Sequence, residues 1–458
     1  MNKIVLFGIL YFSFCPLMAQ KSYMYRIYLK DKAQSAFSVK EPQKYLSQKA
    51  IERRTRQGLK IDATDLPVSS KYLEILHDSG LKIVTKSKWN NSVVVEVKDT
   101  STINEIKNFP FVVRTKKVFT VPDSIPARNM NRKKEVINKY VDTDNYYGDA
   151  FRQIEVHHGD SLHAAGFRGE GIDIAVIDAG FYNADEIDLF KKMHLLGTKD
   201  FVNPKSDIYA ENSHGMKVLS CMAANKPNVM VGTAPEANYW LLRSENNDSE
   251  NPIEEDYWAA AVEFADSVGV DLINTSLGYN EFDDKSANYK YRDLDGHTSL
   301  MSNSASMLAD KGIVLVNSAG NSGRGTWKKI TPPADAENVI TVGAMNRSLM
   351  NGEFSSVGDT ADKRVKPDAM AVGVASAVAS IEGTVSKGNG TSFASPILCG
   401  VVASFWQACP WLTAKQVVEA VQKAGDRYTY PDNIFGYGVP DMWKAYKIEK
   451  AKKENGRR

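Results

Sequence analysis

The stretch Ile174-Ala175-Val176-Ile177-Asp178-Ala179-Gly180 is a short apolar run that ends in a carboxylate and a glycine. An uninterrupted apolar run of this length predicts a strand buried on both faces, as in a parallel sheet. Binding sites in open α/β sheets form outside the carboxyl ends of the strands, where Asp178 would lie. A lone Asp after a strand more often caps a helix or forms a turn, so this signal is weak by itself.

Short apolar strands alternate with helical segments on both sides of this stretch, over residues 148–446. The alternation predicts an α/β domain with a mainly parallel sheet and helices on both faces. The expected strands are 172–177, 239–242, 271–274, 312–316 and 339–342, and the expected helices are 214–224, 254–267, 302–311, 392–409 and 414–424.

Two further segments carry side chains suited to nucleophilic catalysis. His214 is expected at a helix start, where the N-terminus lowers the pKa of an imidazole and suits it to a general base. Ser392 follows two close glycines and opens an apolar helix, whose free N–H groups can bind negative charge. Taken singly, His214 could be a surface or capping histidine and Ser392 an ordinary helix cap.

Together the three segments resemble the subtilisin-like serine protease family (peptidase S8), over roughly residues 148–445. The resemblance lies in the order Asp, His, Ser and in the motifs around Asp178, His214-Gly215 and Gly390-Thr391-Ser392. It implies a catalytic triad in which Ser392 attacks, His214 moves the proton and Asp178 orients the imidazole.

The resemblance also implies an oxyanion hole and an edge that binds substrate. Residues 317–321 resemble the family's oxyanion-hole segment, so the Asn321 amide and the Ser392 backbone N–H would hold the negative oxygen. An extended substrate would pair as an added strand with Ser276, Leu277, Gly278, Ala319 and Gly320.

Three segments depart from the family pattern. Phe393 stands where many members have Met, Met216-Lys217 where many have Thr-His, and Ala371-Val372-Gly373 where Ala-Pro-Gly is usual. None of these departures removes a reacting atom, so they bear on the shape of the subsites and not on the chemistry.

Residues 20–120 have the pattern of a small α+β domain of their own. The expected order β-α-β-β-α-β suggests a ferredoxin-like unit, with an additional charged helical segment at 42–58. Its position and order resemble the inhibitory prodomain of these proteases, and we expect it to dock on the substrate cleft. The alternative is an unrelated accessory domain. Residues 121–147 carry prolines and the basic cluster Arg132-Lys133-Lys134, which predicts an exposed linker that holds the processing site.

Residues 1–19 resemble an export signal, because Lys3 precedes an apolar run too short to span a bilayer and Ala19 suits a cleavage position. We therefore expect an exported protein (secreted, periplasmic or cell-surface) with no membrane attachment after cleavage. The net charge of +2 favours neither nucleic acid nor a membrane surface as a partner. The expected partners are protein or peptide substrates and the chain's own prodomain, and the expected state is a monomer. Residues 447–458 are predicted to be a charged tail, either frayed or the solvated end of a helix.

The cysteines do not predict a disulfide framework, and the acidic residues do not predict a metal site that the reaction needs. Cys221 and Cys399 each follow a catalytic residue by seven positions, so both are expected on buried helix faces as small apolar residues. The chemistry requires no cofactor. Structural calcium, which many family members bind, stays open. An acidic stretch that could serve it, with an ordinary solvated loop as the alternative, contains Asp283, Asp284, Asp293 and Asp295.

The sequence therefore predicts a serine endopeptidase that acts through an acyl-enzyme and is made as a self-processed precursor. One alternative is a degenerate protein that grips peptides without cutting them, against which the complete triad and Asn321 argue. Another is an esterase or acyl transferase on the same fold, since an acyl-enzyme can pass its acyl group to other nucleophiles.

Overall fold

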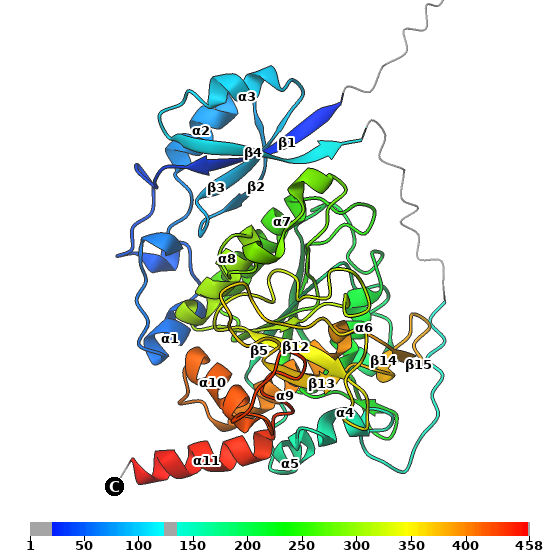
Figure 1. Cartoon of the computed structure of the whole chain (residues 1–458). Coiled ribbons are helices and arrows are strands. Elements are labelled where there is room, and N and C mark those ends of the chain that lie inside the picture. Colours follow the sequence, from blue (N-terminus) through cyan, green and yellow to red (C-terminus); the bar gives the residue numbers. More distant parts are fainter. Residues whose placement is uncertain (1–20, 123–134, 457–458) are drawn as a thin grey trace, which may run out of the picture.

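The computed structural model describes residues 21–122 and 135–456, which form a small N-terminal domain and a larger domain (Figure 1). The predicted export signal and the basic cluster of the predicted linker lie outside the described residues.

A seven-stranded sheet forms the centre of the larger domain, and all of its neighbouring strands pair in parallel. The five predicted strands are confirmed, with ends displaced by up to three residues, and two further strands, β13 and β6, lie at the sheet edges. In spatial order the strands are β13 (Ala369–Val372), β12 (Ile340–Met345), β11 (Val314–Ser318), β10 (Leu272–Thr275), β5 (Asp173–Asp178), β9 (Asn238–Arg243) and β6 (His194–Asp200).

Helices cover both faces of this sheet, and alternate residues of β5 show why. Ile174 and Val176 belong to the apolar core that also contains α9, whereas Ala175 and Ile177 belong to the core beneath α7. Successive side chains of a strand point to opposite faces, so an unbroken apolar strand needs cover on both. The first face carries α6 (His214–Ala223) and α9 (Thr391–Ala408), and the second carries α7 (Ile253–Val268) and α8 (Leu300–Met307).

The remaining elements surround this frame. The predicted helix at 414–424 is α10 (Ala414–Ala424), and the predicted 302–311 helix is α8 followed by a 3-10 turn at Leu308–Lys311. Smaller elements are α4 (Phe151–Glu155), α5 (Gly159–Ala164), the pair β7 (Asn225–Lys226) and β8 (Met230–Val231), and the pair β14 (Ser376–Ala379) and β15 (Val385–Gly388).

The charged C-terminal segment is the solvated end of a helix. α11 runs from Met442 to Asn455, so the predicted boundary at 446 falls inside it, and the second of the two expectations for the tail at 447–458 holds for its residues up to Asn455. Asp441 caps this helix by accepting a hydrogen bond from the Lys444 N–H at 2.8 Å. Met442 and Ala445 are buried, and these anchors hold the first turn while the charged residues beyond stay in solvent.

The N-terminal domain has the predicted ferredoxin-like order. Its antiparallel sheet has the spatial order β2-β3-β1-β4. The helices α2 and α3 pack on one face of this sheet. In chain order the elements are β1 (Ser22–Leu29), α1 (Gln48–Arg56), α2 (Ser70–Asp78), β2 (Lys82–Ser87), β3 (Ser92–Val97), α3 (Ser101–Ile106) and β4 (Val112–Val121).

The turn between β2 and β3 contacts both α7 and α8, the two helices on which the N-terminal domain sits (Figure 1). Trp89 in this turn is buried in one apolar cluster with Trp258 of α7 and Met301 of α8. The Trp89 N–H also donates to Glu263 at 3.0 Å, and Asn90 Nδ2 donates to Ser304 Oγ at 2.7 Å. The domain therefore docks on the α7–α8 face of the larger domain.

Asp266 of α7 is fully buried and binds three cations of the N-terminal domain. Its Oδ1 accepts hydrogen bonds from Arg53 at 2.6 Å and Arg54 at 2.7 Å, and its Oδ2 accepts one from Lys88 at 3.1 Å. Burial opposes the charged carboxylate, but the three cations hold the pKa of Asp266 well below its ordinary value. Arg53 and Arg54 lie on α1, so the charged segment that departs from the prodomain pattern anchors the domain to α7.

We expect Asp266→Ala to weaken the binding of the separate N-terminal domain to the larger domain by at least about 100-fold. The variant leaves the buried Arg53 without its carboxylate and Arg54 with Asp65 alone, and breaking a buried ion pair costs about 3–5 kcal/mol. The measurement is the dissociation constant of residues 21–122 on the separately produced larger domain, which carries Ser392→Ala as a safeguard against cleavage. Lys44→Ala removes only the exposed pair with Glu41 and should change the constant less than about fivefold. An unchanged constant for Asp266→Ala would contradict this account of the interface.

The second half of the predicted exposed linker at 121–147 is held to the larger domain, although many of its side chains, among them Ile137 and Val141, are exposed. Residues 135–147 run along the larger domain, where the Ile137 N–H donates to the Glu382 carbonyl at 2.8 Å. Val136 and Tyr140 pack against the main core. The apolar side chains thus hold this stretch to the larger domain, which begins near residue 135 and not at 148.

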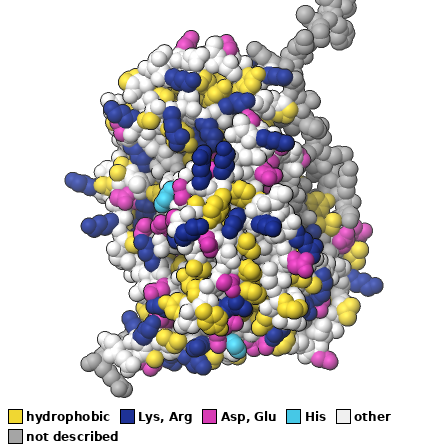
Figure 2. All heavy atoms as spheres, viewed as in Figure 1, with side chains coloured by type: hydrophobic (Ala, Val, Ile, Leu, Met, Phe, Trp, Pro, Cys, Tyr) yellow, Lys and Arg dark blue, Asp and Glu magenta, His cyan; other side chains and the backbone are white. Residues whose placement is uncertain are grey.

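Charged side chains are mixed over the surface. Figure 2 shows Lys and Arg side chains on both domains, interspersed with acidic and hydrophobic ones, in keeping with the small net charge. Within residues 21–122 and 135–456, no helix is long and apolar enough to cross a membrane.

Candidate active site

Asp178 ends β5 at the carboxyl edge of the sheet, as the sequence predicts. Its side chain is buried, and its Oδ1 accepts a hydrogen bond from the Ala179 N–H at 2.8 Å. Gly215 packs so tightly that a Cβ there would lie 2.7 Å from the Cβ of Asp178. The glycine after His214 therefore lets α6 start directly against the end of β5.

His214 is the first residue of α6, and its Nδ1 lies 2.7 Å from Asp178 Oδ1. The carboxylate can only accept, so Nδ1 carries the proton and Nε2 is left as the acceptor. Burial opposes the charged imidazole, but Asp178 and, more weakly, Glu245 outweigh it, so the pKa of His214 is raised. The predicted lowering of this pKa is wrong, because a full negative charge at hydrogen-bond distance outweighs the partial charge of a helix end.

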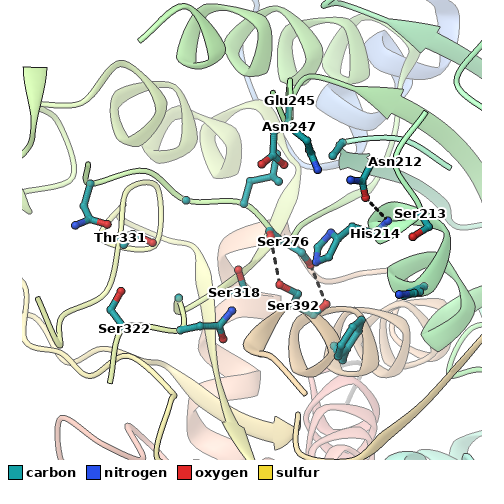
Figure 3. A pocket seen from close by; sticks show the side chains of 18 residues that line it. Asn212, Ser213, His214, Glu245, Asn247, Ser276, Ser318, Ser322, Thr331 and Ser392 are labelled. Carbon is teal, nitrogen blue, oxygen red and sulfur yellow. Dashed lines mark hydrogen bonds between the residues drawn. The ribbon is translucent and has the colours of Figure 1, made fainter. Parts of the chain in front are cut away.

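Ser392 lies in the first turn of α9 and lines the same cleft as His214 (Figure 3). Its hydroxyl donates to the Ser276 carbonyl at 3.4 Å, and the Ser276 hydroxyl donates to the Ser392 carbonyl at 3.0 Å. Catalytic hydrogen bonds are often long or misaligned before substrate binds. In this conformation the Ser392 hydroxyl is bonded to Ser276 and not to His214.

Asn321 is held by its carbonyl end, which leaves its amide donors for the cleft. Oδ1 accepts hydrogen bonds from the Thr391 N–H at 2.9 Å and the Thr391 hydroxyl at 3.0 Å. Asn321 lines the cleft together with Ser392, and its Nδ2 lies 3.8 Å from the position of an ideal Cβ on Gly390. Thr391 is thus a positioning residue for Asn321, a role that the sequence analysis did not assign.

The cleft has a volume of about 530 Å³ and contains most of the predicted substrate-binding residues. Ser276, Leu277, Gly278 and Gly320 line it. Ala319 is a wrong assignment, because it is fully buried and its N–H donates to the Val342 carbonyl at 3.0 Å.

Glu245 and Asn247 line the cleft and were not predicted. They follow β9, the strand next to β5, at the same edge of the sheet as Asp178. The rule that singled out Asp178, a polar side chain just after a buried strand, would also have found Glu245. The other lining residues outside the predicted set are Ala179, Asn212, Ser213, Lys217, Asn280, Ser318, Ser322, Thr331 and Phe393.

The N-terminal domain, as far as the structure describes it, contributes no residue to this cleft. The expectation that the domain docks on the cleft is therefore wrong for residues 21–122, which sit beside it on α7 and α8.

The burial of two predicted thiols is confirmed. Cys221 is 1% exposed and Cys399 is fully buried, and burial raises the pKa of both thiols beyond the range in which they would ionise near neutral pH. Both sulfurs face the core between α6 and α9 as small apolar groups.

The acidic stretch at 283–295 consists of locally capped turns. Asp284 accepts a hydrogen bond from the Ser286 N–H at 3.0 Å, and Asp295 accepts one from the His297 N–H at 2.8 Å. Over the described parts of the chain, no three His, Cys, Asp or Glu side chains gather as metal ligands would.

We expect the mature enzyme to keep its activity in mild hydrogen peroxide and Phe393→Met to lose it. Phe393 packs 6.2 Å from the His214 ring, so a sulfoxide formed at this position would put a polar group against the catalytic imidazole. Met216, the native methionine nearest His214 in sequence, is fully buried. The check is residual kcat/KM after exposure, with sulfoxide at Met350, which is 60% exposed, as proof that the oxidant acted. Equal inactivation of the two enzymes would overturn the prediction.

Comparisons with known proteins found matches to both domains. The Subtilase family model matches residues 169–438, and the Peptidase S8 propeptide domain of Bacteroidota matches residues 24–136. Subtilisin NAT of Bacillus subtilis subsp. natto is 27% identical over 373 residues, which cover 81% of this chain and 84% of that protein. Serine protease AprX of Bacillus subtilis (strain 168) is 30% identical over 304 residues, 59% of this chain and 65% of that protein.

Two solved structures share the fold. The epidermin leader peptide processing serine protease EpiP of Staphylococcus aureus has a TM-score of 0.64 at 14% identity, covering 93% of this chain and 98% of that chain. The MycP3 protease of the type VII (ESX-3) secretion system has a TM-score of 0.53 at 22% identity, and the match covers 69% of this chain and 93% of that chain. With the family model matching more than half of the residues, the chain belongs to the subtilase family and is a serine-type endopeptidase with an N-terminal S8 propeptide domain.

Proposed function

We propose that Asp178, His214 and Ser392 are the catalytic triad of this endopeptidase and that it cuts extended peptide segments through an acyl-enzyme. The observation that carries the proposal is the 2.7 Å contact between His214 Nδ1 and Asp178 Oδ1, in a cleft that Ser392 and Asn321 also line.

The contact supports a specific route for the proton. With Nδ1–H bound to Asp178, Nε2 of His214 faces the reaction as the base that takes the Ser392 proton. Ser392 Oγ attacks the carbonyl carbon, and His214 then gives the proton to the leaving amine. The raised pKa of His214 favours the imidazolium that forms between these two transfers.

The negative oxygen would form beside the N-terminus of α9. The Asn321 amide and the Ser392 N–H would donate to this oxygen, and Thr391 keeps the amide in the donating orientation. Donors that are already in place lose little energy by reorganising during the reaction.

Substrate would enter as an extended strand along Ser276, Leu277 and Gly278, which continue from the end of β10. Backbone pairing of this kind requires a segment without its own secondary structure, so loops and unfolded chains are the expected substrates.

The enzyme would also process its own precursor. β4 ends at Val121 and residues from 135 onward are hydrogen-bonded to the larger domain, so we place the cut between Pro122 and Glu135. This range is narrower than the predicted linker at 121–147. We further propose that residues 1–19 are an export signal that is removed before this step, so that the final protein is an exported enzyme.

A peptide library digested with mature enzyme tests the proposed reaction. Mass spectrometry should find internal cuts, with free carboxylates as the new ends. Addition of a primary amine should give only minor amide products, because water is the normal acceptor. Amides as the main products would favour acyl transfer, and intact peptides would favour a binding protein.

A further inference from the structure

We propose that Glu245 forms a subsite for a lysine or arginine side chain, at the substrate residue that precedes the one whose carbonyl Ser392 attacks. This inference rests on the proposed function and names the specificity of the same cleft.

Glu245 is a carboxyl group on the cleft wall without a committed partner. It lines the cleft beside His214, and no other described side chain is within ion-pairing or hydrogen-bonding distance of its carboxylate. The nearby Arg243 is already occupied, since it pairs with Asp200 at 2.8 Å and Glu211 at 3.3 Å. Glu245 is partly buried, and a ligand cation bound beside it would favour the charged carboxylate over the neutral acid.

The surroundings of Glu245 are acidic. Burial and the charge of Asp178 raise the pKa of Glu245 to about 8, although His214 and Arg243 oppose the rise. Behind it, burial raises the pKa of Glu250 to about 7 and that of Glu254 to about 9. Glu254 accepts a hydrogen bond from the Tyr279 hydroxyl at 3.1 Å. Of these three carboxyl groups, that of Glu245 is the one that lines the cleft.

The direction of an extended substrate decides which residue meets Glu245. Figure 3 shows Glu245 and Asn247 on the His214 side of the cleft, away from Ser322 and Thr331. Successive side chains of a bound strand point to opposite sides. We place the side chain of the residue with the attacked carbonyl toward Ser318 and Thr331, on the opposite part of the cleft from Glu245. The preceding side chain then points toward His214 and Glu245.

The chain's own processing region matches this preference. Between Pro122 and Glu135 the sequence contains Arg128, Arg132, Lys133 and Lys134. A cut after Asn129, Lys133 or Lys134 would place one of these cations in the Glu245 subsite.

The test compares two peptides that differ only in Arg or Leu at the residue preceding the one with the attacked carbonyl. Mature enzyme should show a kcat/KM for the Arg peptide about 10- to 100-fold above that for the Leu peptide, the effect of one charge-assisted hydrogen bond. In Glu245→Gln the ratio should fall to near one. Glu250→Gln removes a charge from the same loop but not from the cleft wall, and it should keep most of the ratio. Labelling by a fluorophosphonate shows that each variant is folded.

The outcomes separate this inference from the proposed function. Cleavage of both peptides at equal rates by the unaltered enzyme would overturn the subsite and leave the peptidase intact. A ratio that survives in Glu245→Gln, or that Glu250→Gln lowers as much as Glu245→Gln, would also overturn it. Cleavage of neither peptide would contradict the proposed function, and the subsite with it.

Discussion

Replacing Ser392 with alanine is expected to lower kcat for peptide hydrolysis by about 10⁶-fold. The change removes the attacking oxygen and leaves the His214–Asp178 pair and the cleft in place. The same variant should accumulate as a precursor that keeps residues 20–122 joined to the larger domain. The measurements are kcat on a peptide and the mass of the purified variant, with and without added active enzyme.

Ser395→Ala is the matched control for this experiment. Ser395 lies one turn further along α9, is fully buried, and donates to Asn274 Oδ1 at 2.9 Å. Its loss should cost about 1–3 kcal/mol of stability, because it leaves a buried acceptor unpaired, while processing continues. A trimmed product of normal mature size from Ser392→Ala alone, free of other proteases, would show that the chain does not cut itself.

Asp178→Asn should lower kcat by about 10⁴-fold and move the pH profile. An amide at this position can hold the imidazole in the wrong tautomer, and it removes the charge that stabilises the imidazolium. In the unaltered enzyme the pKa of His214 is raised, so kcat/KM should rise with pH through a value above the ordinary 6.5. Without the carboxylate that pKa falls, and the residual activity should begin at lower pH.

Asp173→Asn provides the control at the other end of β5. Asp173 pairs with Lys49 of the N-terminal domain at 2.6 Å and is remote from the cleft, so mature enzyme should keep its pH profile. A profile of Asp178→Asn with its midpoint unmoved, or moved to higher pH, would contradict the assigned role of the carboxylate.

The sequence predicts the frame of this fold well because buried elements leave strong patterns. The strand ending at Asp178 and the helix opened by Ser392 are apolar almost throughout, and both were placed within one residue. The edge strand β6 was missed because its residues His194–Asp200 are mostly exposed and mix polar with apolar side chains. Strand periodicity is weak where neither face is deeply buried.

The parts of the site that stand in short local motifs could be predicted from the sequence, and the properties that depend on distant contacts could not. The positions of the proposed triad and Asn321 stand in short motifs. The structure brings His214, Ser392 and Asn321 to one cleft and places the buried Asp178 in contact with His214. The direction of the His214 pKa shift could not be derived from its own helix, since Asp178 lies 36 residues earlier in the chain. The docking of the N-terminal domain on Asp266 also depends on contacts across 178 to 213 residues, which no local pattern records.

The most direct test of the catalytic assignment is covalent labelling of the mature enzyme with a fluorophosphonate, followed by mass spectrometry of its peptides. The account predicts a single modification on Ser392, slowed by added peptide substrate and nearly abolished in His214→Ala. Modification of a different residue, or an enzyme that hydrolyses peptides but resists the label, would contradict it.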